Sequence, residues 1–361
     1  MIARVTNFLQ QTKIQIISII FASLYIAVLL VMAYNKQIFY EKIVQLEEPS
    51  AVAQALANNV EVGLHINSFP RFSIKDTKFT FDGIVWFKFD KGVESFETLE
   101  TFTFKNMVID NTNDQPFFKS KPIIKLIDDK VLISYQVQAT FMAEIAFKKF
   151  PIGGHRINLL IENRNATTRE LLFSIQPENV TFNNEILLDS WQPIAVHTHA
   201  GIVRAKIGGE KNATNITYPS VNVSMDFKNL GARGLISLYF PLFILFFIGL
   251  LSLTIGIFDA ARLGIIASSL PTLVLFRLVI DAVSPDVGYT THIDFVYYIL
   301  VILSFLILFF QTYVILFIER TKNDTEPIQK YKKYCLEAFN GFLFMGIIVA
   351  LLAVMSYDFF H

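Results

Sequence analysis

His197 and His199 are separated by one residue, Thr198, and this pair of imidazoles could bind a ligand. They lie in an alternating segment typical of a β-strand, where both imidazoles would point to one face about 7 Å apart. Imidazole binds divalent metals and titrates near neutral pH, so the pair could hold a metal ion or sense protons. No carboxylate or third histidine lies nearby in the sequence, which favours an ordinary strand pair. We therefore predict no resident metal or cofactor, and His197 and His199 are kept only as metal candidates.

A second chemically capable group lies inside an apolar run, where Ser268, Ser269 and Thr272 are followed by Arg277. Polar side chains in lipid face protein or water, and a cation within a membrane span suggests a function. The hydroxyls could instead bond back to carbonyls of their own helix, and the arginine could reach the outer interface. Because one helix cannot enclose a pore, a conducting interpretation requires several copies around a symmetry axis.

The composition indicates the solvent in which these groups would work. Of 361 residues, 53% are apolar and 17% are charged, with 36 Phe and a mean hydropathy of +0.46, which is typical of a membrane protein. The 31 Lys and Arg balance 31 Asp and Glu, so no nucleic-acid partner is expected. The single cysteine, Cys335, excludes a disulfide within the chain. Near the spans we find no paired carboxylates, His-rich helix or nucleophile motif, so an enzyme is not expected.

Five apolar runs approach or exceed the roughly 20 residues that cross a hydrocarbon layer about 30 Å thick. They are Ile16–Tyr34, Leu235–Phe258, Leu263–Ile280, Phe295–Ile318 and Ala338–Tyr357. The first run is longer than the apolar core of a cleaved signal peptide, so residues 1–35 are predicted to be a signal-anchor transmembrane helix.

The short-loop cations all fall on one side if the five spans alternate, and the positive-inside rule makes that side cytoplasmic. These cations are Arg4, Lys13, Arg262, Arg320, Lys322, Lys330, Lys332 and Lys333. The loop 281–294 carries acids but neither Lys nor Arg. This loop, the C-terminal His361 and the long segment between the first two spans are therefore expected outside, with the N-terminus inside.

That long segment, residues 36–234, is predicted to form one antiparallel β-sandwich. Its apolar residues alternate in short runs such as Val60–Ile66 and Val221–Phe227, separated by turn sequences such as Asp82-Gly83 and Gly208-Gly209. A short helix is expected at Ser50–Asn58. Residues 235–361 would then form a four-helix transmembrane domain with helices at 235–258, 263–280, 295–318 and 338–357.

Four short motifs now support a specific resemblance. The most specific is Pro285-Asp286-Val287-Gly288-Tyr289-Thr290-Thr291-His292-Ile293-Asp294, and the others are Tyr239-Phe240-Pro241, Phe150-Pro151-Ile152 and the strand pair around Ile74–Phe81. Together with the order of elements over about residues 59–357, they resemble the bacterial pentameric ligand-gated ion channels, the prokaryotic relatives of Cys-loop receptors. In that family these motifs are the linker into the third channel helix, a proline early in the first one, and two loops that touch the membrane domain.

The resemblance implies a homopentamer whose pore is lined by the helix 262–282. Counting back from Pro285, the pore-lining residues would be Arg262, Gly264, Ser268, Pro271, Leu275, Leu278 and Ala282. Pro271 stands where the family has its gating leucine or isoleucine, so the gate is expected to be bent or displaced, leaving Leu275 and Leu278 as the constriction. Asp259 would favour cations at the inner mouth, whereas the run ending at Arg262 is similar to that of anion-selective relatives, so selectivity stays open.

The coupling interface implied by the resemblance consists of Asp76, Phe150, Pro151, Tyr289, Thr290, Ile293 and Arg233. Gly153 and His155 replace the Asp and Gln that usually follow the Phe-Pro motif. The family binds ligands between neighbouring sandwiches, here at a hairpin Ile207–Thr217 and a loop Asn163–Arg169. Neither contains the aromatic residues that cage an amine, so an amine ligand is disfavoured.

The function expected from these observations is a ligand-gated ion channel in a bacterial inner membrane. Its partners would be four further copies, membrane lipid, inorganic ions and an unknown small ligand, proton or divalent cation. The alternative is a non-conducting membrane receptor or complex subunit with the same periplasmic or extracellular sensor, which Pro271 and the altered Phe-Pro loop motivate.

Overall fold

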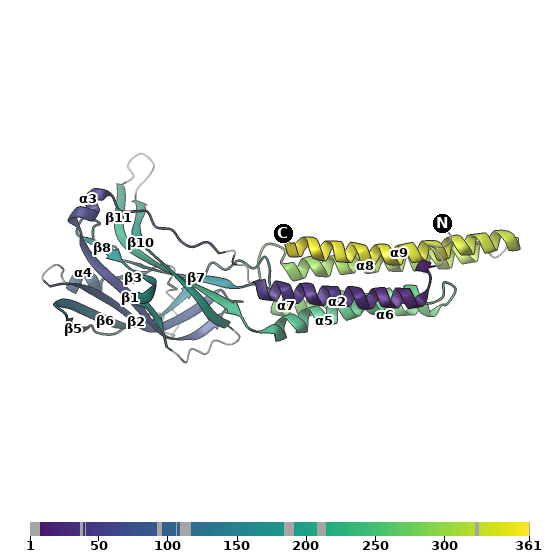
Figure 1. The fold of residues 1–361 in the computed structure, drawn as a ribbon, viewed down its shortest axis with the longest axis horizontal. Coiled ribbons are helices and arrows are strands. Elements are labelled where there is room, and N and C mark those ends of the chain that lie inside the picture. Colours follow the sequence, from purple (N-terminus) through teal and green to yellow (C-terminus); the bar gives the residue numbers. More distant parts are fainter. Residues whose placement is uncertain are drawn as a thin grey trace. The chain divides into compact units, whose positions relative to one another are not determined.

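The computed structural model describes residues 8–36, 39, 41–91, 96–105, 107–108, 117–183, 191–207, 214–321 and 325–360. Arg4, Lys322 and His361, which were used for the orientation, and positions 208–213 of the predicted hairpin lie outside these residues. The chain forms two compact units (Figure 1). The helical unit consists of the chain up to Gln37, the short segment Phe147–Gly153 and everything from Gly231 onward. The β unit consists of Ile38–Ala146 and Gly154–Leu230.

The strands of the β unit form two sheets. The larger has seven strands: β1 (Asn58–Ser73), β2 (Lys78–Asp90), β4 (Phe117–Lys119), β5 (Ile123–Ile127), β6 (Lys130–Met142), β8 (Leu171–Ser174) and β9 (Val180–Phe182), in the order β4-β6-β2-β1-β8, with β5 on β6 and β9 on β1. The smaller has four strands in the order β10-β11-β7-β3: β3 (Thr103–Phe104), β7 (His155–Glu162), β10 (Trp191–Ile207) and β11 (Thr214–Asn229). The short helix α3 (Ala51–Leu56) precedes β1, whereas α4 (Phe96–Glu100) lies between β2 and β3 and η1 (Pro177–Asn179) lies between β8 and β9.

Among the described strands the pairing is antiparallel with two exceptions, because β8 and β9 both run parallel to β1. The prediction of a purely antiparallel fold is therefore wrong at this edge. Both strands are three or four residues long, and such short segments carry no pattern that distinguishes parallel from antiparallel pairing. The helix expected at Ser50–Asn58 is present as α3, where the Ser50 hydroxyl accepts the hydrogen bond of the Ala53 amide at 3.3 Å.

Alternation along the strands explains why the β unit folds. In β2 every second residue from Phe79 to Phe89 is buried. In β11, Val221, Val223, Met225 and Phe227 enter the same apolar core, which holds side chains from both sheets. The intervening residues of β11, which include Ser220, Asn222, Ser224 and Asp226, are polar and face away from this core, yet they are buried too.

A segment at residues 41–47, here called the strap, covers part of that polar face. The side-chain amide of Asn158 on β7 donates to the Lys42 carbonyl at 3.3 Å. The side-chain amide of Asn222 on β11 donates to the Val44 carbonyl at 3.1 Å. The Glu47 amide donates to the Ile202 carbonyl of β10 at 3.2 Å, and the Ile202 amide donates to the Glu47 carbonyl at 2.9 Å. The strap thus touches three successive strands of the smaller sheet.

Among its described residues, the helical unit contains five helical segments that are long and apolar enough to cross a membrane, as predicted. They are Thr12–Lys36, Ala232–Thr254, Ala261–Val283, His292–Thr321 and Glu326–Tyr357. The corresponding elements are α2 (Thr12–Lys36), α5 (Ala232–Leu251) with η2 (Ser252–Thr254), α6 (Ala261–Leu275) with α7 (Arg277–Val283), α8 (His292–Thr321) and α9 (Glu326–Phe360). The protein is therefore a multi-pass membrane protein.

The first helix packs within the bundle along the other helices (Figure 1). Ala22 of α2 is fully buried, and Tyr25 shares a hydrogen bond of 2.9 Å with Ser356 of α9. Near the other end of α2, the Ser18 hydroxyl lies 3.8 Å from the sulfur of Met345, also on α9. This first helix therefore belongs to the same apolar core as the four later spans.

Candidate functional site

The segment Phe147–Gly153 follows β6 and precedes β7 in sequence, but it packs in the helical unit. The Phe147 amide donates to the Tyr289 hydroxyl at 2.9 Å, and the His292 amide donates to the Lys148 carbonyl at 2.9 Å. The Ile293 amide donates to the Phe150 carbonyl at 3.3 Å. These bonds hold the segment, here called the Phe-Pro loop, against the linker between α7 and α8.

The sequence of the loop accounts for its shape. The Phe150 amide bonds back to the Phe147 carbonyl at 3.0 Å, and the Ile152 amide bonds to the Lys149 carbonyl at 2.7 Å, forming two consecutive turns. Gly153 has φ 119°, a conformation that a side chain would strain, which explains the glycine at this position. Phe150 and Ile152 pack against the apolar core of the helices.

The start of α8 is fixed by a carboxylate. One oxygen of Asp294 accepts hydrogen bonds from the Thr291 amide at 2.8 Å and from the Thr291 hydroxyl at 2.7 Å. The bond to the amide is the one that the third helical residue makes in a capping box. The other oxygen of Asp294 is ion-paired with Arg277 of α7, which also lies 2.8 Å from Asp281. Arg277 is thus bonded within its own chain and connects α7 directly to the cap of α8.

A buried hydrogen bond also connects α5 to the start of α8. The Tyr239 hydroxyl and the Nδ1 atom of His292 are hydrogen-bonded, and both side chains are buried. The first residue of α8 is therefore bonded to the Phe-Pro loop through its amide and to α5 through its ring. Movement of any one of these elements would have to be accommodated by the other two.

The predicted coupling residues are divided between the two units. Phe150, Pro151, Tyr289, Thr290 and Ile293 gather around the Phe-Pro loop and the α7–α8 linker. Asp76 belongs to the β unit, in the turn between β1 and β2, where its carboxylate accepts from the Ser73 hydroxyl at 2.9 Å. Arg233 is exposed in the first turn of α5.

The predicted pore stripe lies on one exposed face of α6 and α7. Gly264, Ser268, Pro271, Leu275, Leu278 and Ala282 are all exposed in the single chain. The opposite face, with Ile266, Leu273 and Ile280, is buried against other helices. Hydroxyls on the exposed face bond back to their own helix, as Thr272 does to the Ser268 carbonyl at 2.9 Å. The face is therefore mildly polar, and its role as a pore lining stays a prediction.

Arg262 does not belong to this face, and the predicted stripe needs this correction. Its side chain is 3% exposed, and its guanidinium donates to the Ser252 carbonyl at 3.0 Å and to the Asn340 side-chain oxygen at 2.6 Å. The reason is helical geometry, since Arg262 and Gly264 are two residues apart and lie about 200° apart around the axis. The exposed charge before α6 is Asp259, whose carboxylate accepts from the Ala261 amide at 2.9 Å.

Pro271 lies inside α6, which ends at Leu275, and α7 begins at Arg277. Phe276 between them keeps right-handed helical angles, with φ −61° and ψ −16°. Its amide bonds to the Thr272 carbonyl at 3.0 Å and the Leu273 carbonyl at 3.2 Å, so the span is continuous here. The amide that proline lacks would have bonded to the Ala267 carbonyl, so the missing bond lies in the turn before Pro271.

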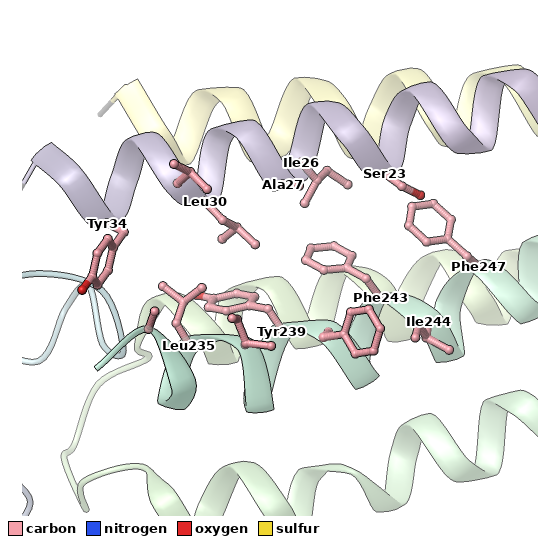
Figure 2. Close-up of a pocket in the computed structure, with 14 residues that line it drawn as sticks. Ser23, Ile26, Ala27, Leu30, Tyr34, Leu235, Tyr239, Phe243, Ile244 and Phe247 are labelled. Atoms are coloured by element: carbon pink, nitrogen blue, oxygen red, sulfur yellow. The ribbon is translucent and has the colours of Figure 1, made fainter. Parts of the chain in front are cut away.

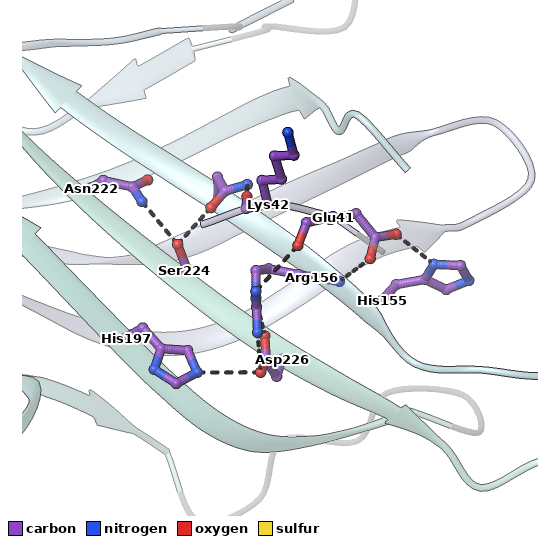
Figure 3. A network of polar contacts seen from close by, with 9 residues as sticks. Glu41, Lys42, His155, Arg156, His197, Asn222, Ser224 and Asp226 are labelled. Atoms are coloured by element: carbon purple, nitrogen blue, oxygen red, sulfur yellow. Dashed lines mark hydrogen bonds and ion pairs between the residues drawn. The ribbon is translucent and has the colours of Figure 1, made fainter. Parts of the chain in front are cut away.

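A network of charged side chains lies on the polar face of the smaller sheet (Figure 3). Glu41 of the strap accepts from the Ala146 amide at 3.0 Å and lies 2.9 Å from the Nδ1 atom of His155. Arg156 forms a two-pronged ion pair with Asp226, at 2.6 and 2.8 Å, and also donates to the Glu41 carbonyl at 3.2 Å.

Electrostatics favour the charged forms of Glu41 and Arg156. Burial by itself raises the pKa of Glu41, but the hydrogen bond and the charge of His155 together with the Ala146 amide bring this pKa below its usual value. The bond to Asp226 raises the pKa of Arg156 further. His155 thus connects β7, the strand after the Phe-Pro loop, to the strap.

The two candidate metal ligands, His197 and His199, both bond to neighbours on this face. The Nε2 atom of His197 lies 3.3 Å from an Asp226 oxygen, and the Nδ1 atom of His199 accepts from the Leu46 amide at 3.3 Å. Among the described residues there is no group of three side chains that could hold a metal ion. Sequence proximity missed Asp226, which the pairing of β10 with β11 brings next to His197.

The predicted ligand region is described only on one side, the loop 163–169 and its flanks. Glu162 is fully buried and ion-paired with Arg164, whose guanidinium lies 5.9 Å from the ring centre of Tyr218. One Glu162 oxygen and the Ser220 hydroxyl are buried without a hydrogen-bond partner. This part of the region therefore offers a carboxylate and a cation rather than an aromatic cage.

No protein-family model matches this sequence, and no curated protein matches it significantly.

Proposed function

We propose that the chain is one subunit of a homopentameric ligand-gated ion channel in a bacterial inner membrane. In this proposal the two sheets form a β-sandwich outside the cytoplasm, followed by a four-helix channel domain with α2 added to it. The observation that carries the proposal is the exposed, mildly polar face of α6 and α7, which no helix of the same chain covers among the described residues. Four further copies around an axis would turn this face toward a shared water-filled path.

The Phe-Pro loop supports a gating route. Its flanking strands, β6 and β7, belong to the β unit, so a rearrangement of these strands pulls on the loop through the covalent chain. The loop is bonded to the first residues of α8, and Asp294 of α8 is ion-paired with Arg277 of α7. A stimulus at the β unit would therefore tilt the helix that bears the exposed face.

The exposed face of α6 and α7 and the residue before it also suggest where the pore would close and which ions it would prefer. Leu275 and Leu278 are 64% and 68% exposed and would form two apolar rings in a pentamer, which close a pore by excluding water. Because Arg262 is buried, Asp259 is the charge available at the inner mouth, and we assign a preference for cations.

The test is the oligomeric mass in detergent followed by ion flux in vesicles. A ring of five copies is expected, and Leu275→Ser should increase basal flux because it wets the constriction. Leu306→Ser is the matched control, since Leu306 is a similarly exposed leucine on α8, away from the stripe. A monomer or dimer in mild detergent, or equal flux for both variants, contradicts the proposal.

Asp259→Asn tests the selectivity assignment by reversal potentials measured in a salt gradient. A shift toward chloride is expected, because the neutral amide no longer concentrates cations at the mouth. An unchanged reversal potential would remove Asp259 from the selectivity filter.

A second function, a non-conducting receptor or complex subunit, is favoured by Pro271, which lies inside α6. Proline removes one backbone hydrogen bond from the helix that would have to line the pore. Pentamers that stay closed to ions in both wild type and Leu275→Ser would favour this alternative.

A further inference from the structure

An apolar groove of about 410 Å³ runs between α2 and α5 on the helical unit. Figure 2 shows Ile26, Ala27 and Leu30 of α2 facing Leu235, Tyr239 and Phe243 of α5 across it. The groove depends on the first helix, which supplies one of its two walls.

The groove presents hydrocarbon alone. Of the hydroxyls in its lining, that of Ser23 donates to the Ile19 carbonyl at 2.9 Å and that of Tyr239 is bonded to His292. Tyr34 is at the far end of the lining, close to the end of α2. A polar ligand would therefore lose its hydration without gaining hydrogen bonds, whereas an alkyl chain would lose nothing.

The length of the groove matches one leaflet of a bilayer. On α2 the lining extends from Ser23 to Tyr34, eleven residues apart, which at 1.5 Å per residue is about 16 Å. Half of a hydrocarbon core about 30 Å thick is about 15 Å. Since both helices are long enough to span the membrane, the groove opens sideways to the acyl chains of a single leaflet.

One end of the groove carries the groups that meet lipid headgroups. Tyr34 lies close to the end of α2 at Lys36, and Ala232 is the first residue of α5, followed by the exposed Arg233. Tyrosine and basic residues are typical of the membrane interface, and a cation there attracts anionic phospholipid. We propose that the α2–α5 groove binds one acyl chain of an anionic phospholipid whose phosphate lies at Arg233.

The experiment uses the full chain, purified in mild detergent from membranes that contain phosphatidylglycerol, with retained lipid counted per chain by mass spectrometry. Ala27→Trp places an indole in the groove and is expected to reduce retained phospholipid at least fivefold. Val28→Trp is the matched control, because Val28 is the exposed neighbouring residue of α2 and is not part of the groove lining. It should retain lipid as the wild type does. Should Ala27→Trp aggregate, Ile244→Trp fills the same groove from α5.

Arg233→Gln tests the headgroup by photo-crosslinking with phosphatidylglycerol or phosphatidylethanolamine that carries a diazirine in its acyl chain. Labelling of groove residues by phosphatidylglycerol should fall about fivefold, and labelling by phosphatidylethanolamine should change little.

Four results overturn the proposal. The first three are equal lipid retention in wild type and Ala27→Trp, absence of labelling at the groove, and equal loss of labelling for both lipids in Arg233→Gln. The fourth is a helix of another copy in the groove. This occupant would appear as a covalent dimer when a photoreactive amino acid replaces Ala27.

Discussion

Glu41 of the strap is the residue whose removal tests the charged network most directly. Its side chain is 3% exposed and receives hydrogen bonds from the Ala146 amide, the Arg156 amide and the ring of His155. Glu41→Gln keeps one acceptor oxygen but removes the charge, so at least one buried donor loses its partner. A hydrogen bond to a charged group contributes about 1.5–3 kcal/mol, so we expect a loss of about 2 kcal/mol.

Intrinsic fluorescence is a suitable assay, because both tryptophans, Trp86 and Trp191, lie in the β unit. For a unit of this size, about 2 kcal/mol corresponds to a decrease of roughly 4–8 °C in the melting temperature. Glu47→Gln is the matched control on the same strap. The Glu47 carboxylate is 56% exposed and lies 3.0 Å from Arg204, and such a surface pair contributes below about 1 kcal/mol.

The pH dependence provides an independent check. The pKa of Glu41 is lower in the folded protein than its usual 4.5, so the folded state binds fewer protons here than the unfolded state. Its contribution is therefore fully present above about pH 4.5 and is lost as the pH falls through the folded pKa. The difference in melting temperature between wild type and Glu41→Gln should shrink on acidification. A difference below 1 °C at pH 7, or one that grows toward pH 4, would refute the reasoning.

Two further predictions concern the contacts of the Phe-Pro loop and of the strap. Tyr289→Phe removes the hydroxyl that accepts from the Phe147 amide, at a cost of about 1 kcal/mol, so trypsin should cleave after Lys148 about fivefold faster. An unchanged rate would mean that this bond does not hold the loop. Gly201→Ala places a methyl group 2.6 Å from the Glu47 carbonyl oxygen, so the strap must shift there. Amide hydrogen exchange at Glu47 should accelerate at least tenfold, and unchanged protection would show that the strap tolerates the methyl group.

The membrane helices could be predicted from the sequence because length and apolar composition alone decide whether a segment can span a bilayer. The runs from Ile16 and from Phe295 lie inside α2 and α8, and each helix is longer than its run by a few polar residues at its ends. Alternation likewise predicted the strands around Val85 and Val221, which enter the core.

The network of Glu41, Arg156 and Asp226 could not be predicted, because its members are seventy or more positions apart and are joined only by strand pairing and the strap. The inclusion of Arg262 in the stripe was a different failure. The heptad-like spacing of the other six residues is sound, but a two-residue step places a side chain on the far face of a helix. Apolar surroundings then force the guanidinium to find carbonyl and amide oxygens inside the bundle.

The division of the chain between its two units limits how the protein can be dismantled. The polypeptide passes from one unit to the other near residues 37, 146, 153 and 230, so the β unit is joined at both of its ends and again in its middle. A soluble fragment cut at the two ends would keep the Phe-Pro loop but lose the surface on which it rests. Grafting this β unit onto a foreign pore domain would likewise require the recipient to supply a tyrosine and two free amides in register with that loop.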